Sequence, residues 1–220
     1  MLKVVIYDSG YGGENFADAL EQALPVVEVI RVIDWRNADK ILLNSKSARR
    51  AAIEALRPYI GNVDLIIFAN HLLTITSLNF FRKRYRNQKF IGLNLKEPTT
   101  FVDRDILILT TRAVARTLEY KLFVHNLKRH TSTLTVDSWP AKIDDGELSE
   151  DEIKATIVSH MVTKNIQPEE VILACAQFND IEQELKNVLG KSLIIHDSFS
   201  DAIREACKVL KVRGSVKKKK

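Results

Sequence analysis

The sequence predicts an α/β protein with two similar doubly wound parallel-sheet domains and a cleft between them. Strand-like and helix-like patterns alternate along the chain, as in parallel sheets that are covered by helices. Short β-branched runs such as Val4-Val5-Ile6 are typical of buried parallel strands. Pro98-Thr99-Thr100 separates two groups of four expected strands, and the second group repeats the layout of the first. A cleft between the domains would collect the strand-end loops of both.

The periodicity defines the expected elements in order. The expected strands are 3–7, 26–33, 65–69, 89–93, 106–110, 134–137, 171–174 and 192–196. The expected helices are 14–24, 47–59, 74–85, 112–126, 149–165, 179–189 and 200–210. A capping box that begins at Ser149 starts one helix, and Pro168 marks where that helix stops. Asp144-Asp145-Gly146 is expected to form a turn.

These elements define the expected domains. Residues 1–97 with 199–212 form the first α/β domain, to which the final helix returns, and residues 98–198 form the second. Residues 213–220 end in four lysines and are expected to form a basic disordered tail.

Composition narrows the function classes. Hydrophobic residues make up 45% of the chain and charged residues 28%, an ordinary globular mixture. A transmembrane helix needs about 20 apolar residues, and no apolar run is close to that length. No signal peptide precedes the first strand. No membrane partner is therefore expected. Cys175 and Cys207 are the only cysteines, which suits a reducing cytoplasm.

The net charge of +5 comes from the end of the chain. Residues 211–220 contain six of the positive charges, which leaves residues 1–210 with a net charge of −1. A nucleic-acid partner is therefore not expected. The sequence contains no P-loop and no metal-ligand spacing, so no metal, nucleotide or pyridoxal cofactor is expected.

Asp8-Ser9-Gly10 follows the first expected strand, and Gly12 and Gly13 come directly before a helical pattern. Ligands of open α/β sheets bind beyond the carboxyl ends of the strands, and glycine lets them approach the backbone. The alternative is a tight turn in which the glycines serve only geometry and Asp8 caps the helix. Taken alone, this segment favours the turn.

Polar or reactive side chains also follow other strands. Asn70 and His71 come after the third expected strand, Thr111 after the fifth and Cys175 after the seventh. A thiol at a helix N-terminus is reactive because its pKa is lowered, whereas many free cysteines are small core residues. The residues by themselves leave both interpretations of Cys175 open.

Several segments together carry a resemblance to a known family. They are Asp8 to Gly13, Ile67 to His71, Ile91 to Pro98, Leu109 to Tyr120, Trp139-Pro140, Asp145-Gly146, Leu173 to Phe178 and Ile195 to Ser198. In this order and spacing they resemble the cofactor-independent glutamate racemases, which open on D-S-G-x-G-G. That family carries A-C-N-T at the second of these segments, E-G at Asp145-Gly146 and L-G-C-T-H-Y around Cys175.

The resemblance implies two-base chemistry without a cofactor. Two cysteines on opposite faces of an amino acid's Cα remove and return its proton, which inverts the centre. The aspartate of D-S-G assists the first cysteine, and a histidine two positions after the second cysteine assists that one. The implied partner is a small acidic amino acid, glutamate or aspartate, and the implied process is D-glutamate supply for peptidoglycan. A homodimer would be usual for this family.

This chain departs from the family at the chemical positions. Ala69 stands at the first cysteine position, and Gln177 replaces the histidine that assists Cys175. His71 is the nearby titratable replacement for the missing base; alternatively, and in our view preferably, it fills or lines an altered pocket. The candidate residues are Cys175, Asp8 and His71 for catalysis and Ser9, Asn70, Thr111 and Gln177 for substrate binding, with no metal ligand.

Three hypotheses follow, and whether the protein is an enzyme stays open among them. The first is an amino-acid isomerase whose activity is weak or altered, with Cys175 serving one face and Asp8 or His71 the other. The second is an inactive homologue, a pseudoenzyme, that binds a small acid or a protein partner. The third is a lyase or decarboxylase that needs protonation from one face only.

Overall fold

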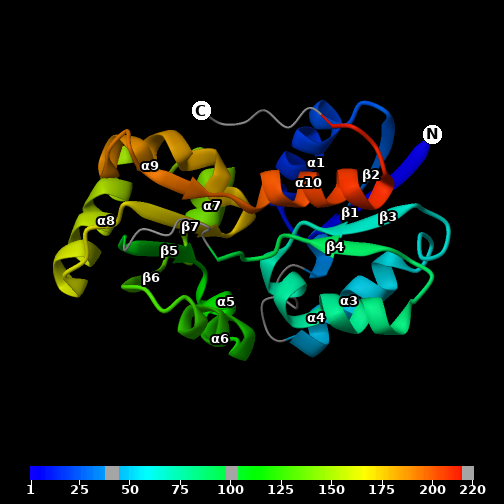
Figure 1. Cartoon of the computed structure of the whole chain (residues 1–220), viewed down its shortest axis with the longest axis horizontal. Helices are drawn as coiled ribbons and strands as arrows, with labels where there is room; N and C mark the ends of the chain where they lie inside the picture. The colour runs from blue at the N-terminus through cyan, green and yellow to red at the C-terminus, as the bar shows by residue number, and fades with distance from the viewer. Residues whose placement is uncertain (38–44, 98–103, 215–220) are drawn as a thin grey trace. The chain divides into compact units, whose positions relative to one another are not determined.

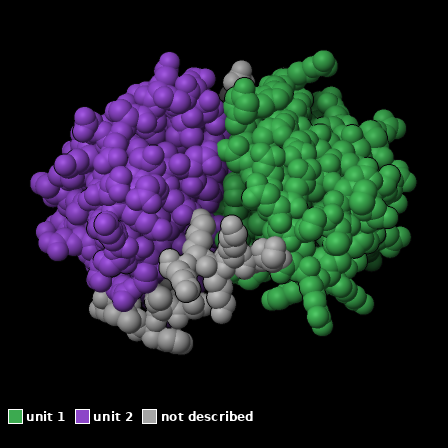
Figure 2. Space-filling view, turned by 90° about the horizontal axis from the view of Figure 1, so that it is seen from above, with its two compact units in different colours: residues 1–94, 198–220 green, residues 95–197 purple. Residues whose placement is uncertain are grey.

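The computed structural model describes residues 1–37, 45–97 and 104–214. The chain divides into two compact units, which Figure 2 colours separately. Unit 1 comprises residues 1–94 and 198–220, and unit 2 comprises residues 95–197. Each unit contains one four-stranded sheet, and all of the strand pairs in both sheets are parallel.

The sheet of unit 1 has the strand order β2-β1-β3-β4. Its strands are β1 (Leu2–Asp8), β2 (Val27–Ile33), β3 (Leu65–Phe68) and β4 (Phe90–Gly92). Its helices are α1 (Tyr11–Ala23), α3 (Ser45–Leu56), α4 (His71–Arg84) and α10 (Ser198–Leu210), and a 3₁₀ turn, η1 (Trp35–Asn37), follows β2.

Helices cover both faces of this sheet, with α1 and α10 on one side and α3 and α4 on the other (Figure 1). Successive strand residues point to opposite faces, so Val5 and Tyr7 join the core on the side of α3 and α4. On the other side, the ring of Phe16 in α1 contacts the ring of Phe199 in α10, with centroids 5.0 Å apart. Unit 1 is therefore doubly wound, and its last helix comes from the end of the chain.

The sheet of unit 2 has the equivalent order, β6-β5-β7-β8. Its strands are β5 (Ile106–Thr110), β6 (Thr131–Thr135), β7 (Glu170–Ala174) and β8 (Ile194–His196). Its helical segments are α5 (Arg112–Ala115), α6 (Leu118–Asn126), α7 (Trp139–Asp144), α8 (Glu150–Lys164), η2 (Ala176–Ile181) and α9 (Glu182–Leu189). Trp139 and Phe178 pack edge to face in a core shared by α7, α8, η2 and α9.

The shared strand order creates equivalent positions in the two units. The order reverses between β1 and β3 in unit 1 and between β5 and β7 in unit 2, and ligands of open α/β sheets bind at such switch points. Ala69 directly follows β3, and Cys175 directly follows β7. The predicted α/β fold with two similar parallel sheets is confirmed, and the two cysteine positions of the resemblance directly follow equivalent strands.

Several local predictions differ from the structure, and helices α1 and α4 each begin three residues earlier than expected, at Tyr11 and His71. The helix expected over 112–126 is two helices, because Thr117 caps α6 by accepting a hydrogen bond from the Tyr120 N–H. Helix α7 was not expected; Pro140 lies in its first turn, where proline is tolerated. Strand β6 begins at Thr131 rather than at 134. Within the described ranges, no helix is both long enough and apolar enough to cross a bilayer.

Gly13 allows α1 to lie against the end of β1. A Cβ atom at this position would lie 2.5 Å from the Cβ of Asp8 and 2.9 Å from Cδ1 of Ile33. Gly13→Ala would gain about 1 kcal/mol of helix propensity, whereas overpacking costs about 1–3 kcal/mol. We expect the clash to dominate, with a net loss of up to about 2 kcal/mol in the free energy of unfolding, measured by urea denaturation. A more stable variant would show that this contact is not tight.

Candidate functional site

In unit 1, Asp8, Ser9 and Asn70 come together at the carboxyl ends of β1 and β3. The Asp8 carboxylate oxygen Oδ1 accepts hydrogen bonds from the Ser9 backbone N–H (2.7 Å) and from the Asn70 amide Nδ2 (2.9 Å). Nδ2 of Asn70 also lies 3.4 Å from the Ser9 hydroxyl. Three of the residues predicted for the site are therefore in direct contact within one unit.

Asn70 also determines where α4 begins. Its side-chain oxygen accepts a hydrogen bond from the Leu73 N–H at 2.9 Å, which caps the helix. Because that oxygen faces the helix, the NH₂ group of the same amide is directed to Asp8. The start of α4 thus orients the donor that holds the Asp8 carboxylate.

Ala69 and His71 flank Asn70, and both are buried. Ala69 is fully buried, and His71 is 3% exposed. Neither ring nitrogen of His71 has a hydrogen-bond partner among the residues that the structure describes, and burial lowers the pKa of His71 to about 3. His71 is therefore a neutral imidazole at pH 7, which favours the interpretation that it fills a pocket.

The segment after β2 adds polar groups that the sequence did not identify. The Asp34 N–H donates to the Asp8 carbonyl oxygen at 2.8 Å, and the Tyr7 hydroxyl donates to the Asp34 carboxylate at 3.2 Å. Burial, followed by the negative charge of Asp34, raises the pKa of Tyr7 well above its usual range. An open pocket of about 400 Å³ adjoins this segment and is lined by Val32, Ile33, Asp34, Trp35, Arg36, Ala55, Pro58 and Tyr59.

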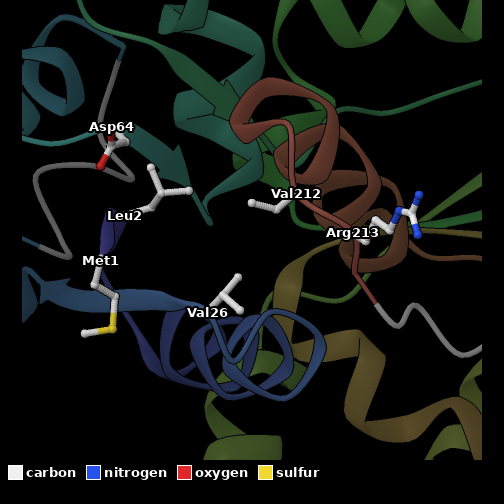
Figure 3. A pocket seen from close by; sticks show the side chains of 6 residues that line it. All are labelled: Met1, Leu2, Val26, Asp64, Val212 and Arg213. Atoms are coloured by element: carbon white, nitrogen blue, oxygen red, sulfur yellow. The ribbon is translucent and has the colours of Figure 1, made fainter.

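A larger open pocket of unit 1, about 700 Å³, lies away from the predicted residues. It is lined by Met1, Leu2, Val26, Asp64, Val212 and Arg213, and Figure 3 shows Leu2, Val26 and Val212 around it. Leu2 begins β1 and Asp64 directly precedes β3, so this pocket lies at the amino ends of the strands. Ligands of parallel sheets bind at the opposite edge.

In unit 2, Thr111 and Cys175 follow the neighbouring strands β5 and β7. Thr111 is the N-cap residue of α5. The adjacent Arg112 donates its backbone N–H to Asp137 at 2.6 Å, and its guanidinium lies 3.2 Å from the same carboxylate. Thr111 therefore occupies the expected strand-end position beside an ion pair.

Cys175, Gln177 and Asp144 form a chain of two hydrogen bonds in unit 2. The Cys175 thiol donates to the side-chain oxygen of Gln177 at 3.1 Å, and the Gln177 NH₂ group donates to the Asp144 carboxylate at 3.5 Å. Burial raises the pKa of Asp144 to about 6, and the negative charges of Asp180 and Asp145 add to the rise. The Gln177 hydrogen bond opposes it.

Asp144 was not among the predicted site residues. The sequence signal was present, because Asp144-Asp145-Gly146 lies where the racemase pattern has E-G, but that match aligns Asp145 with the family's glutamate. Helix α7 ends at Asp144, and the structure directs Asp144 rather than Asp145 to Gln177. Among the residues described in both units, no group of three or more His, Cys, Asp or Glu side chains is placed to hold a metal ion.

Comparisons with known proteins also indicate a similarity to glutamate racemases. No protein-family model matches the chain. The glutamate racemase of Clostridium botulinum is 24% identical over 200 residues, which covers 87% of this chain and 77% of that protein. The crystal structure of the Campylobacter jejuni glutamate racemase superposes with a TM-score of 0.77 at 21% identity, covering 100% of this chain and 89% of that one.

A second solved structure gives the same result. The Escherichia coli glutamate racemase, in complex with L-glutamate and the activator UDP-MurNAc-ala, has a TM-score of 0.78 at 19% identity and covers 97% of this chain and 84% of that one. This protein is therefore glutamate-racemase-like, in sequence over most of its length and in the fold of both units.

Proposed function

We propose that this protein is a cofactor-independent isomerase that transfers protons at the Cα of a small acidic amino acid, glutamate or aspartate. The residues proposed for this activity are Asp8, Ser9 and Asn70 at the strand ends of unit 1 and Thr111, Cys175 and Gln177 at the strand ends of unit 2. In a cell that builds peptidoglycan, the process served is D-glutamate supply, in the cytoplasm.

One observation carries this proposal. At the equivalent positions after β3 and β7, Ala69 is buried and has no group that exchanges protons, whereas Cys175 is partly exposed and hydrogen-bonded. Only one of the two thiols of the racemase pattern remains. Loss of a general acid or base costs about 10²–10⁴-fold in rate, so inversion is slow compared with an enzyme that has both cysteines.

Asp8 is the better candidate for the face that lacks a cysteine. Its carboxylate lies at the carboxyl end of β1, beside the hydroxyl of Ser9 and the amide of Asn70. His71 remains a candidate, but its ring is buried and its nitrogens have no hydrogen-bond partner among the described residues, whereas the Asp8 carboxylate is held by Ser9 and Asn70 at the strand ends. We therefore assign proton removal to Asp8 and proton delivery on the other face to Cys175.

A second candidate function follows from the same missing thiol. A lyase or decarboxylase of this fold generates its carbanion by breaking a bond other than Cα–H, so it needs a proton donor on one face only. With Ala69 at one cysteine position and Cys175 at the other, the chain retains one such proton donor. A homologue that binds a small acid without turnover would retain Asp8 and Asn70 and would exchange no proton.

We predict slow exchange of the Cα proton in D₂O. L- and D-glutamate and L- and D-aspartate are each incubated with the protein, and the Cα–H signal is followed by NMR. One enantiomer should exchange faster than its mirror image, and the product should carry deuterium. Cys175→Ala should lower that rate about 10²–10⁴-fold.

Cys207→Ala is the matched control, because Cys207 lies in α10 of unit 1, away from the predicted residues. It should leave the exchange rate unchanged. The isomerase proposal is excluded if none of the four substrates exchanges. Saturable binding without exchange would instead establish the binding-only homologue.

We also predict that His71 makes the protein sensitive to acid. Its pKa is about 3 when folded and about 6.5 when unfolded, so the unfolded state takes up a proton first as the pH falls below 6.5. This contribution to stability is complete above the unfolded pKa and decreases toward pH 3. Between pH 7.5 and 5.0 it amounts to about 2 kcal/mol in the free energy of unfolding.

His71→Leu should remove this part of the pH dependence in urea denaturation at the two pH values. His125→Gln, at an exposed position of α6, should retain it. An unchanged pH dependence in His71→Leu would mean that the folded protein protonates His71 readily. That result would return His71 to the role of the second base.

A further inference from the structure

The chain of hydrogen bonds from Cys175 to Asp144 has a direction. A carboxylate accepts hydrogen bonds and cannot donate them, so Asp144 attracts the NH₂ group of the Gln177 amide. The amide oxygen is then left facing the sulfur, where it accepts the thiol hydrogen at 3.1 Å. The position of Asp144 thus determines which end of Gln177 meets Cys175.

This orientation selects one protonation state of the sulfur. An oxygen acceptor stabilises the S–H form and disfavours the thiolate, which itself needs donors or positive charge. In the racemase pattern, a histidine occupies the position of Gln177, and a protonated imidazole would stabilise the thiolate. Glutamine in place of this histidine therefore favours the thiol form of Cys175 over the thiolate.

We infer that Gln177, oriented by Asp144, holds Cys175 in its thiol form, so that Cys175 delivers a proton to substrate and does not remove one. Asp144 is a positioning residue, since it acts through Gln177. The role in catalysis rests on the proposed function, whereas the protonation state of Cys175 is a property of the protein alone.

The proposed proton transfer has two steps. Asp8 takes the Cα proton, and the electron pair of the broken C–H bond stays on the substrate as a carbanion. A new C–H bond then forms on the opposite face with the hydrogen of Cys175, whose S–H bond breaks and leaves the electron pair on sulfur. Water reprotonates the thiolate and removes the proton from Asp8. The resting protein is therefore competent for one enantiomer only.

Other charges near Asp144 provide a control for a simple electrostatic effect. Asp145 and Asp180 both act on Asp144 through their negative charge. Asp145 is exposed, next in sequence to Asp144, and its carboxylate is not hydrogen-bonded to Gln177 among the contacts described. Asp145→Asn therefore removes a similar charge but leaves the hydrogen-bond chain in place.

The test measures the pKa of the Cys175 thiol without substrate. In the full chain with Cys207→Ser, the rate of alkylation of Cys175 by iodoacetamide is followed against pH by mass spectrometry. We expect a thiol pKa above the usual value of about 8.5. Asp144→Asn should lower it by at least about one unit, and Asp145→Asn should change it by less than about a third of that.

Gln177→His serves as a second variant, since it presents a cationic group to the sulfur and should also lower the thiol pKa. If Asp144→Asn does not fold, as judged by circular dichroism, the thiol pKa of Cys175 in Gln177→His tests the inference instead. A thiol pKa at or below about 8.5 in the parent chain, or equal shifts in Asp144→Asn and Asp145→Asn, would overturn the inference. A raised thiol pKa without Cα–H exchange would refute the proposed function and leave this inference standing.

Discussion

The hydrogen bond between Asn70 and Asp8 joins the fold of unit 1 to its candidate chemistry. Asn70 uses its oxygen to start α4 and its NH₂ group to hold the Asp8 carboxylate. This geometry requires β1 and β3 to be neighbours, which the strand order β2-β1-β3-β4 ensures. A side chain that caps a helix and holds a carboxylate at a switch point cannot be moved without disturbing both.

Unit 2 repeats the architecture with different groups. Cys175 stands after β7 as Ala69 stands after β3, and the thiol is hydrogen-bonded to Gln177, which in turn contacts Asp144. The two units therefore supply unequal chemistry from equivalent strand ends. A carboxylate with amide and hydroxyl partners comes from one unit and a thiol with an amide acceptor from the other. This asymmetry is the physical basis of our proposal of a slow isomerase that prefers one enantiomer.

Much of the fold could be predicted because its signals are local. Alternating strands and helices indicated the parallel sheets, and Ser149 caps α8 as predicted, accepting a hydrogen bond from the Glu152 N–H at 3.2 Å. The proximity of Asp8 and Asn70 could also be expected from the sequence, since the carboxyl ends of neighbouring parallel strands meet at one edge of the sheet.

The features of the candidate site that could not be predicted depend on tertiary packing. The burial of the His71 ring has no periodic signal in the sequence. Asp144 was missed because a short helix ends on it, and the pattern Asp-Asp-Gly indicates only the turn that follows. Which of two adjacent aspartates reaches Gln177 depends on the rotation of α7, and that rotation is set by Trp139 in the core of unit 2.

We propose that the strand ends of the two units retain a racemase-type set of residues from which one thiol and its counterpart's histidine helper have been lost. The most direct measurement is the rate at which Ala69→Cys combined with Gln177→His converts L-glutamate to D-glutamate, followed by polarimetry. We expect a rate at least about 10²-fold above that of the unmodified chain, since the second acid–base group is restored. A folded double variant whose two site thiols react with iodoacetamide, yet which inverts glutamate no faster, would contradict it.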